Sequence, residues 1–158
     1  MTAVLNAPKI ESLTVPVNSL RVAFEGERKS LKNRRQVDSS IRIVTPDGQK
    51  LTVSNRFWTT FCQNFGFSRN IFDLFDYDEV LDRLGKIRKT NVRLAYESMP
   101  DKESFNGRLL SCTNPSRPML NAEQVAELIQ KYKGTKQTYD TGVVGVHFPA
   151  AFPMKFQV

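Results

Sequence analysis

The chain has 158 residues, of which 40% are hydrophobic and 25% are charged, and its formal net charge is +7. This length suits one domain with a core of ordinary size, and the composition excludes a fibrous or wholly disordered chain. No apolar run approaches the roughly 20 residues of a membrane helix, and the N-terminus lacks the basic and apolar regions of a secretion signal, so a cytoplasmic protein without membrane partners is expected.

The first 19 residues predict a flexible or extended N-terminal arm, because they contain Pro8 and Pro16 and show no sustained periodicity. Order is expected from Leu20, where apolar residues alternate through Val22 and Phe24 with the period of a half-buried strand. A single domain is predicted over residues 20–148, and residues 149–158 form an irregular apolar C-terminal extension.

A β-hairpin is predicted within residues 41–54, where two strand-like runs flank Pro46, Asp47 and Gly48. Proline fixes φ early in a turn, and glycine accepts a positive φ late in it. Short apolar or alternating runs predict further strands at residues 92–99, 107–112 and 141–148.

The first predicted helix begins after the hairpin and contains a dense group of aromatic residues. At 100° per residue its large side chains fall on one face, whereas its threonines and amides fall on the other. Ser54 or Asn55 can cap its start, and Gly66 can adopt the left-handed conformation that ends it. The shared face indicates core packing and consists of Phe57, Trp58, Phe61, Cys62 and Phe65.

Three further helices are expected. A short one follows Ser68 as its cap, and the next begins at Asp76, with Glu79 at capping-box spacing and an apolar face that includes Ile87. The last runs over residues 121–134, begins with the cap-like pair Asn121 and Gln124, and has an apolar face of Val125, Leu128, Ile129 and Tyr132.

The order of strands, helices, strands, helix and strand predicts an α+β fold. We expect a small antiparallel sheet, made of the hairpin and the later strands, packed against about four helices.

Catalytic chemistry has little support in the sequence. Cys62 and Cys112 are expected to be buried free thiols, since two cysteines without a secretion signal are usually reduced. His147, the single histidine, lies in a strand-like run, which favours a structural role. A nucleophilic pair of Cys62 and His147 stays open, because such partners meet in space, although the aromatic face around Cys62 is typical of an inert thiol.

The acidic residues between positions 73 and 82 could indicate a cation site, because hard cations bind several oxygen ligands. These residues lack the spacing of a calcium loop, and helix capping explains carboxylates in a first turn. Glycine-rich phosphate loops, dinucleotide fingerprints and serine elbows are also absent from the sequence. We therefore predict no metal, no cofactor and no catalytic residue, and expect that the chain is not an enzyme.

Positive charge is concentrated in the two ends of the chain. Residues 1–50 carry nine basic and five acidic groups, residues 51–105 carry eight of each, and residues 106–158 carry six and three. Clustered cations are what phosphate neutralisation requires, although a solvated basic loop that aids solubility is an equally simple interpretation. The predicted nucleic-acid contacts are Arg28, Lys29, Lys32, Arg34, Arg35, Lys86, Arg88, Lys89 and Arg93.

Proteins that bind single strands often add exposed aromatics on which bases stack. Trp58 lies near the edge of the aromatic face of the first predicted helix and is the candidate for such exposure.

Three segments, RFWTTFCQNFGFSRNIFDLF, GRLLSCTNPSRPML and DTGVVGVHFPAAFPMKFQV, together resemble the N-terminal part of a family of phage- and prophage-associated proteins of unknown function. The resemblance covers residues 40–158 and implies a role in DNA recombination or annealing, but no catalytic residue. If the chain is phage-encoded, its location would be the host cytoplasm.

The sequence thus favours a non-enzymatic basic module that binds nucleic acid through phosphate contacts, without sequence preference. The alternative is a viral or phage structural or assembly protein that acts through its terminal segments. In that case the partner is a protein, either another copy or a different chain, bound through the apolar C-terminal segment.

Overall fold

The computed structural model describes residues 9–26, 39–100, 102–148 and 154–157. The fold is α+β, and the chain divides into two compact units. The central unit comprises residues 11–116, and the C-terminal unit combines residues 1–10 with residues 117–158. The sequence predicted one domain over residues 20–148; the structure instead gives each unit a hydrophobic core of its own.

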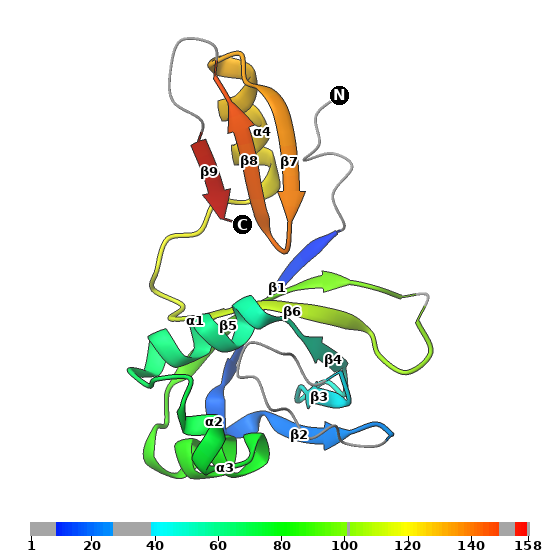
Figure 1. Cartoon of the computed structure of the whole chain (residues 1–158), viewed down its shortest axis with the longest axis vertical. Coiled ribbons are helices and arrows are strands. Elements are labelled where there is room, and N and C mark those ends of the chain that lie inside the picture. The colour runs from blue at the N-terminus through cyan, green and yellow to red at the C-terminus, as the bar shows by residue number, and fades with distance from the viewer. Residues whose placement is uncertain (1–8, 27–38, 101, 149–153, 158) are drawn as a thin grey trace. The chain divides into compact units, whose positions relative to one another are not determined.

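The central unit contains a mixed six-stranded sheet in the order β1-β5-β6-β4-β3-β2 (Figure 1). The prediction of a small antiparallel sheet was therefore wrong in size and in pairing. β4 and β6 run parallel, with Leu51 opposite Gly107, because three helices and β5 separate them in the chain and allow a crossover. The strands are β1 (Ile10–Pro16), β2 (Arg21–Phe24), β3 (Ile41–Val44), β4 (Lys50–Val53), β5 (Asn91–Ser98) and β6 (Gly107–Thr113).

The N-terminal segment is part of this sheet. Residues 10–16 form β1 beside β5, and Val17–Ser19 form a 3-10 turn, η1, whose Val17 N–H donates to the Thr90 carbonyl at 2.9 Å. Val15 and Val17 are buried in the core. An arm was expected through residue 19, but burial of these two valines holds residues 11–19 in the central unit.

The three predicted helices between the hairpin and β5 are present as α1 (Asn55–Phe65), α2 (Ile71–Leu74) and α3 (Tyr77–Ile87). The Ser54 side chain caps α1 by accepting from the Phe57 N–H at 3.0 Å, and Gly66 ends it at a φ of 75°. Asp76 is the N-cap of α3, as predicted, but its side chain makes no cap bond and the capping box with Glu79 does not form. The predicted cap of α2 was wrong, because Asn70 and not Ser68 is its N-cap.

The aromatic face of α1 lies in the core of the central unit, which confirms that prediction. Phe57, Trp58 and Phe61 are each no more than 1% exposed. The Trp58 ring stacks on Tyr77 with centroids 4.8 Å apart and meets Phe72 edge to face at 4.9 Å, so that α1, α2 and α3 share one aromatic cluster.

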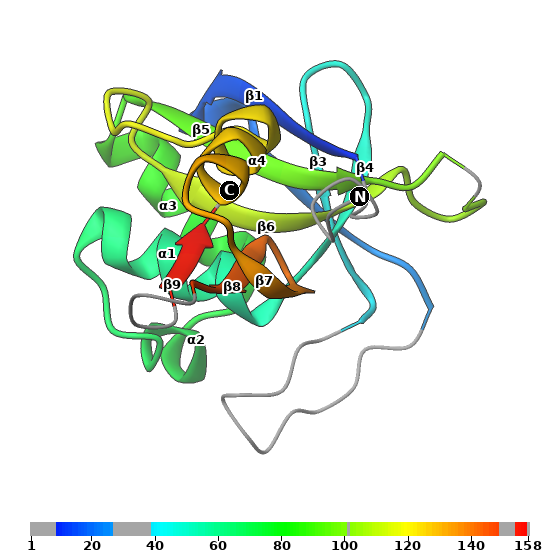
Figure 2. The ribbon, with the colours of Figure 1, turned by 90° about the horizontal axis from the view of Figure 1, so that it is seen from above.

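The C-terminal unit packs α4 (Ala122–Lys131) on one face of a three-stranded antiparallel sheet (Figure 1, Figure 2). The predicted capping box forms, since the Asn121 and Gln124 side chains each accept from the other's backbone N–H. The strands are β7 (Thr135–Asp140), β8 (Val143–His147) and β9 (Met154–Gln157). The sequence did not predict β7, and part of its expected irregular C-terminal end, residues 154–157, forms β9.

Candidate functional site

The basic tract that was predicted to bind nucleic acid falls outside the described residues. Arg28, Lys29, Lys32, Arg34 and Arg35 lie between Gly26 and Ser39, where the description is interrupted. The flanking strands β2 and β3 pair antiparallel with Phe24 opposite Ile41, and the Glu25 N–H donates to the Ser40 carbonyl at 2.8 Å. In the sequence the tract lies between these two paired strands.

Three of the other predicted cations lie together at the end of α3. Lys86, Arg88 and Lys89 are all exposed, and Ile87 between them is 76% exposed. Ile87 was expected on the buried apolar face, but the last turn of α3 extends past the core that holds Val80, Leu81 and Leu84.

The charges at the end of α3 are weakly compensated. Lys86 Nζ lies 3.1 Å from Asp82 Oδ2, but both side chains are more than two-thirds exposed, so solvent screens this pair. Arg88 and Lys89 form no ion pair with any described residue. These side chains can therefore meet an incoming anion without first breaking a strong internal contact.

Arg93 does not lie on the same surface. It follows Val92 on β5, and side chains alternate across a strand, so it faces away from the core that α3 covers. Its Nη1 lies 3.4 Å from the Pro115 carbonyl, and the side chain is half-buried. The expected group of four cations is thus divided by the sheet.

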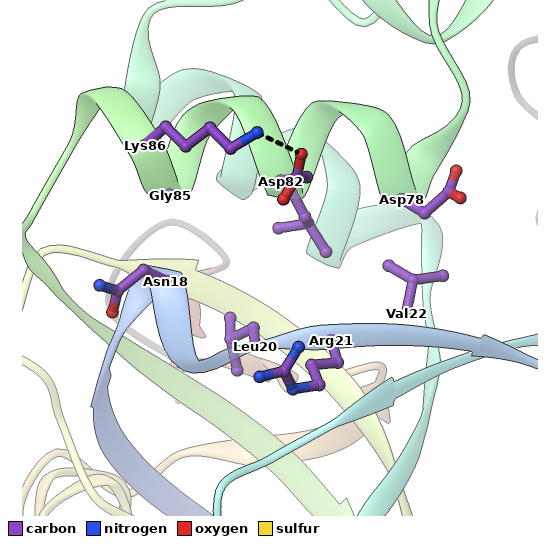
Figure 3. Close-up of a pocket in the computed structure, with 9 residues that line it drawn as sticks. Asn18, Leu20, Arg21, Val22, Asp78, Asp82, Gly85 and Lys86 are labelled. Atoms are coloured by element: carbon purple, nitrogen blue, oxygen red, sulfur yellow. Dashed lines mark ion pairs between the residues drawn. The ribbon is translucent and has the colours of Figure 1, made fainter.

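A groove of about 470 Å³ lies between α3 and the segment that joins η1 to β2 (Figure 3). Arg21 lines its β2 wall, Lys86 and Asp82 line its α3 wall, and Leu20 and Leu81 give it an apolar base. Arg21 is exposed and was not among the predicted contacts. The strand alternation could have indicated an outward Arg21, but nothing local links it to Lys86. Arg21, Lys86, Arg88 and Lys89 are called the basic patch below.

The groove depends on a close approach of two backbones. A Cβ atom at Gly85 would lie 3.0 Å from Asn18 Cα and 3.1 Å from Asn18 Cβ. A larger residue at this position would require Asn18 to move by a few tenths of an ångström, so glycine favours the close packing of α3 on η1 beside the groove.

Trp58 cannot stack on a nucleic-acid base in this structure. The prediction that it could be exposed was wrong, because Phe72 from α2 and Tyr77 from α3 cover the indole.

The two cysteines are buried free thiols, as predicted. Burial raises the pKa of Cys62 to about 11, despite the nearby Arg69 charge, and raises that of Cys112 to about 12. Such thiols are protonated at neutral pH and are poor nucleophiles. His147 is half-buried on β8, within the C-terminal unit.

Within the described ranges, no group of three or more His, Cys, Asp or Glu side chains is placed to hold a metal ion. In the same part of the chain, no helix combines the length and apolar character needed to cross a membrane.

No family model, curated protein or solved structure matches the chain. The resemblance to phage-associated proteins therefore stays a prediction.

Proposed function

We propose that the protein is a non-enzymatic module that binds nucleic acid through backbone phosphates, as the charge distribution of the sequence predicts. The observation that carries this proposal is the basic patch: Arg21 from β2 and Lys86 from α3 line the same groove, and the exposed Arg88 and Lys89 follow Lys86 at the end of α3. In the sequence the five-cation tract lies between β2 and β3, and Arg21 is the member of the basic patch that belongs to β2.

Phosphate is the ligand that best matches these side chains. Each cation that contacts a phosphate releases condensed counterions, so binding strength depends on the number of contacts and not on base identity. Asp78 and Asp82 also line the groove, which disfavours a free, highly charged anion deep inside it. A backbone that passes over the exposed cations at the rim avoids these carboxylates.

The direct test is a titration of single- and double-stranded DNA and RNA of equal length at two or more salt concentrations. If the five tract cations contact a single strand, the log-log salt slope is about −3.5, and contacts by the basic patch make it steeper. Absence of binding at low salt would contradict the proposal.

The variant Arg88→Gln/Lys89→Gln tests the patch itself. We expect a smaller salt slope, by about 1.4, and weaker binding to every sequence. Lys102→Gln is a suitable control, because Lys102 is also exposed but lies in the connection between β5 and β6. A loss in Lys102→Gln half as large as that in the double variant would mean that only net charge matters, because the control removes one charge and the double variant removes two.

The alternative function, assembly through the terminal segments, is favoured by one observation. β9 is one of the two edge strands of its sheet, and an edge strand can accept a strand from another chain. Deletion of residues 154–158 removes that edge and leaves α4, β7 and β8. Under this alternative the deletion abolishes concentration-dependent assembly, measured by sedimentation, and leaves nucleic-acid affinity unchanged.

A further inference from the structure

Tyr132 is the most exposed aromatic side chain in the part of the chain whose side chains the structure describes, at 57%. The helical projection placed it on the apolar face of α4, but it is the C-cap residue and leaves the helix with φ −102° and ψ 12°. Its ring meets the buried Phe148 edge to face, with centroids 6.3 Å apart, and Lys131 Nζ lies 5.3 Å from its centroid. Tyr132 is therefore exposed and yet held in position.

The next residue, Lys133, has an unusual backbone conformation for a side chain of its kind. Its φ is 55°, in the left-handed region that glycine normally occupies at this position after a helix. The Lys133 N–H donates to the Gln130 carbonyl at 3.3 Å, and the Gly134 N–H donates to the Ile129 carbonyl at 2.8 Å, which is a Schellman motif.

Packing explains why the glycine is one residue later. A Cβ atom at Gly134 would lie only 2.5 Å from Val146 Cγ1 and 3.0 Å from Phe148 Cε1, so Gly134 is required for contact between the end of α4 and the sheet. Nothing comparable requires lysine at position 133. The helix dipole is already met by Lys131 in the last turn, and glycine would adopt the same φ without strain. Strained non-glycine residues of this kind concentrate at functional sites.

We propose that Lys131, Tyr132 and Lys133 form a binding site for single-stranded nucleic acid, in which a base stacks on Tyr132 and the two lysines contact the flanking phosphates. All three side chains are exposed. A single strand is specified because the bases of a duplex are already stacked and do not offer a free face to an aromatic ring. The inference rests on the proposed function and adds a second contact surface, in the C-terminal unit.

The first test compares Tyr132→Ala with Tyr132→Phe on a fluorescently labelled oligothymidine and on a duplex of the same length. Stacking on one base predicts that Tyr132→Ala weakens single-strand binding by about 5-fold or more, whereas Tyr132→Phe retains it. Because stacking releases no counterions, the salt slope stays unchanged. An unchanged single-strand affinity, or an equal loss on the duplex, overturns the inference.

The second test replaces the strained lysine. Lys133→Gly removes one phosphate contact and should make the single-strand salt slope shallower by about 0.7. Thr141→Gly is the matched control, since Thr141 also has a positive φ, 46°, but lies in the turn between β7 and β8. We expect it to bind like the parent protein. If both glycine variants bind alike, Lys133 is not a contact and the inference fails.

The two proposals fail in distinguishable ways. If Arg88→Gln/Lys89→Gln weakens binding while Tyr132→Ala and Lys133→Gly do not, the proposed function stands and this site is wrong. If the parent protein binds neither the oligothymidine nor the duplex at low salt, both are wrong.

Discussion

Tyr96 Oη donates a hydrogen bond of 2.9 Å to Glu11 Oε2 and so connects β5 to β1. Tyr96→Phe should lower the free energy of unfolding by about 1 kcal/mol, because it leaves the part-buried carboxylate without this donor. Urea unfolding checks the change. Tyr132→Phe, whose ring is exposed, is the control and should unfold like the parent protein.

The hydrogen bond from Tyr96 to Glu11 should also affect the stability of the protein at alkaline pH. Burial and the contact with Glu11 raise the pKa of Tyr96 above its ordinary value of 10. The unfolded chain therefore releases this proton first, and stability falls as the pH rises through 10. In Tyr96→Phe this part of the alkaline loss should be absent. An identical pH dependence in both proteins would contradict the assignment.

Trp58 is the single tryptophan, so its fluorescence reports on the core of the central unit. The emission should be blue-shifted relative to free tryptophan and resist quenching by iodide, because the indole is 1% exposed. Addition of oligonucleotide should leave it unquenched. Trp58→Ala should cost about 3–5 kcal/mol of stability. Strong iodide quenching of the folded protein would show that the aromatic cluster is open.

Cys62 and Cys112 should react with thiol reagents only when the protein unfolds. Their raised pKa values, about 11 and about 12, keep both protonated at pH 8, and both side chains are buried. Above pH 9 the unfolded chain loses these protons before the folded one, so stability should fall between pH 9 and about pH 12. Rapid labelling of one thiol in native protein would instead indicate an accessible site.

The two strained residues of the C-terminal unit should respond to glycine in the same direction. Lys133→Gly and Thr141→Gly each remove a side chain from the left-handed region, and each should stabilise the unit by about 1 kcal/mol. The gain is limited by the extra conformational freedom that glycine has in the unfolded chain. Thermal unfolding measures it. Destabilisation of either variant would mean that contacts of the lost side chain outweigh the strain.

The helices could be predicted from the sequence because their signals are local. A cap such as Ser54, a capping box such as Asn121 with Gln124, and the aromatic period of α1 all lie within a few residues of the structure they specify. The parallel pairing of β4 with β6 has no such signal, since it joins Leu51 to Gly107 across the whole helical segment. β7 was missed for a related reason: its sequence, TKQTYD, lacks apolar alternation, and its conformation follows from pairing with β8.

The candidate site was predictable to a similar extent. The exposure of the cations at the end of α3 could be predicted, because the apolar pattern of the helix stops before them. The position of Arg21 beside Lys86 could not, because it depends on how α3 packs on η1. The orientation of Arg93 away from the core could be predicted from strand alternation, because its neighbours Val92 and Leu94 are apolar and face the core. The exposure of Tyr132 could not be predicted from the helical period, because the chain leaves the helix at that residue.

The strand order also affects the protein while it is being synthesised. β3 and β4 can form their hairpin as soon as they leave the ribosome, but β6, which pairs with the other side of β4, emerges more than fifty residues later. Until then Leu51 and Val53 belong to an open sheet edge in the middle of the future core. Nascent chains are therefore most prone to aggregate in this interval. Helix α1, which packs on β6 in the folded protein, also lacks its docking surface until β6 has joined the sheet.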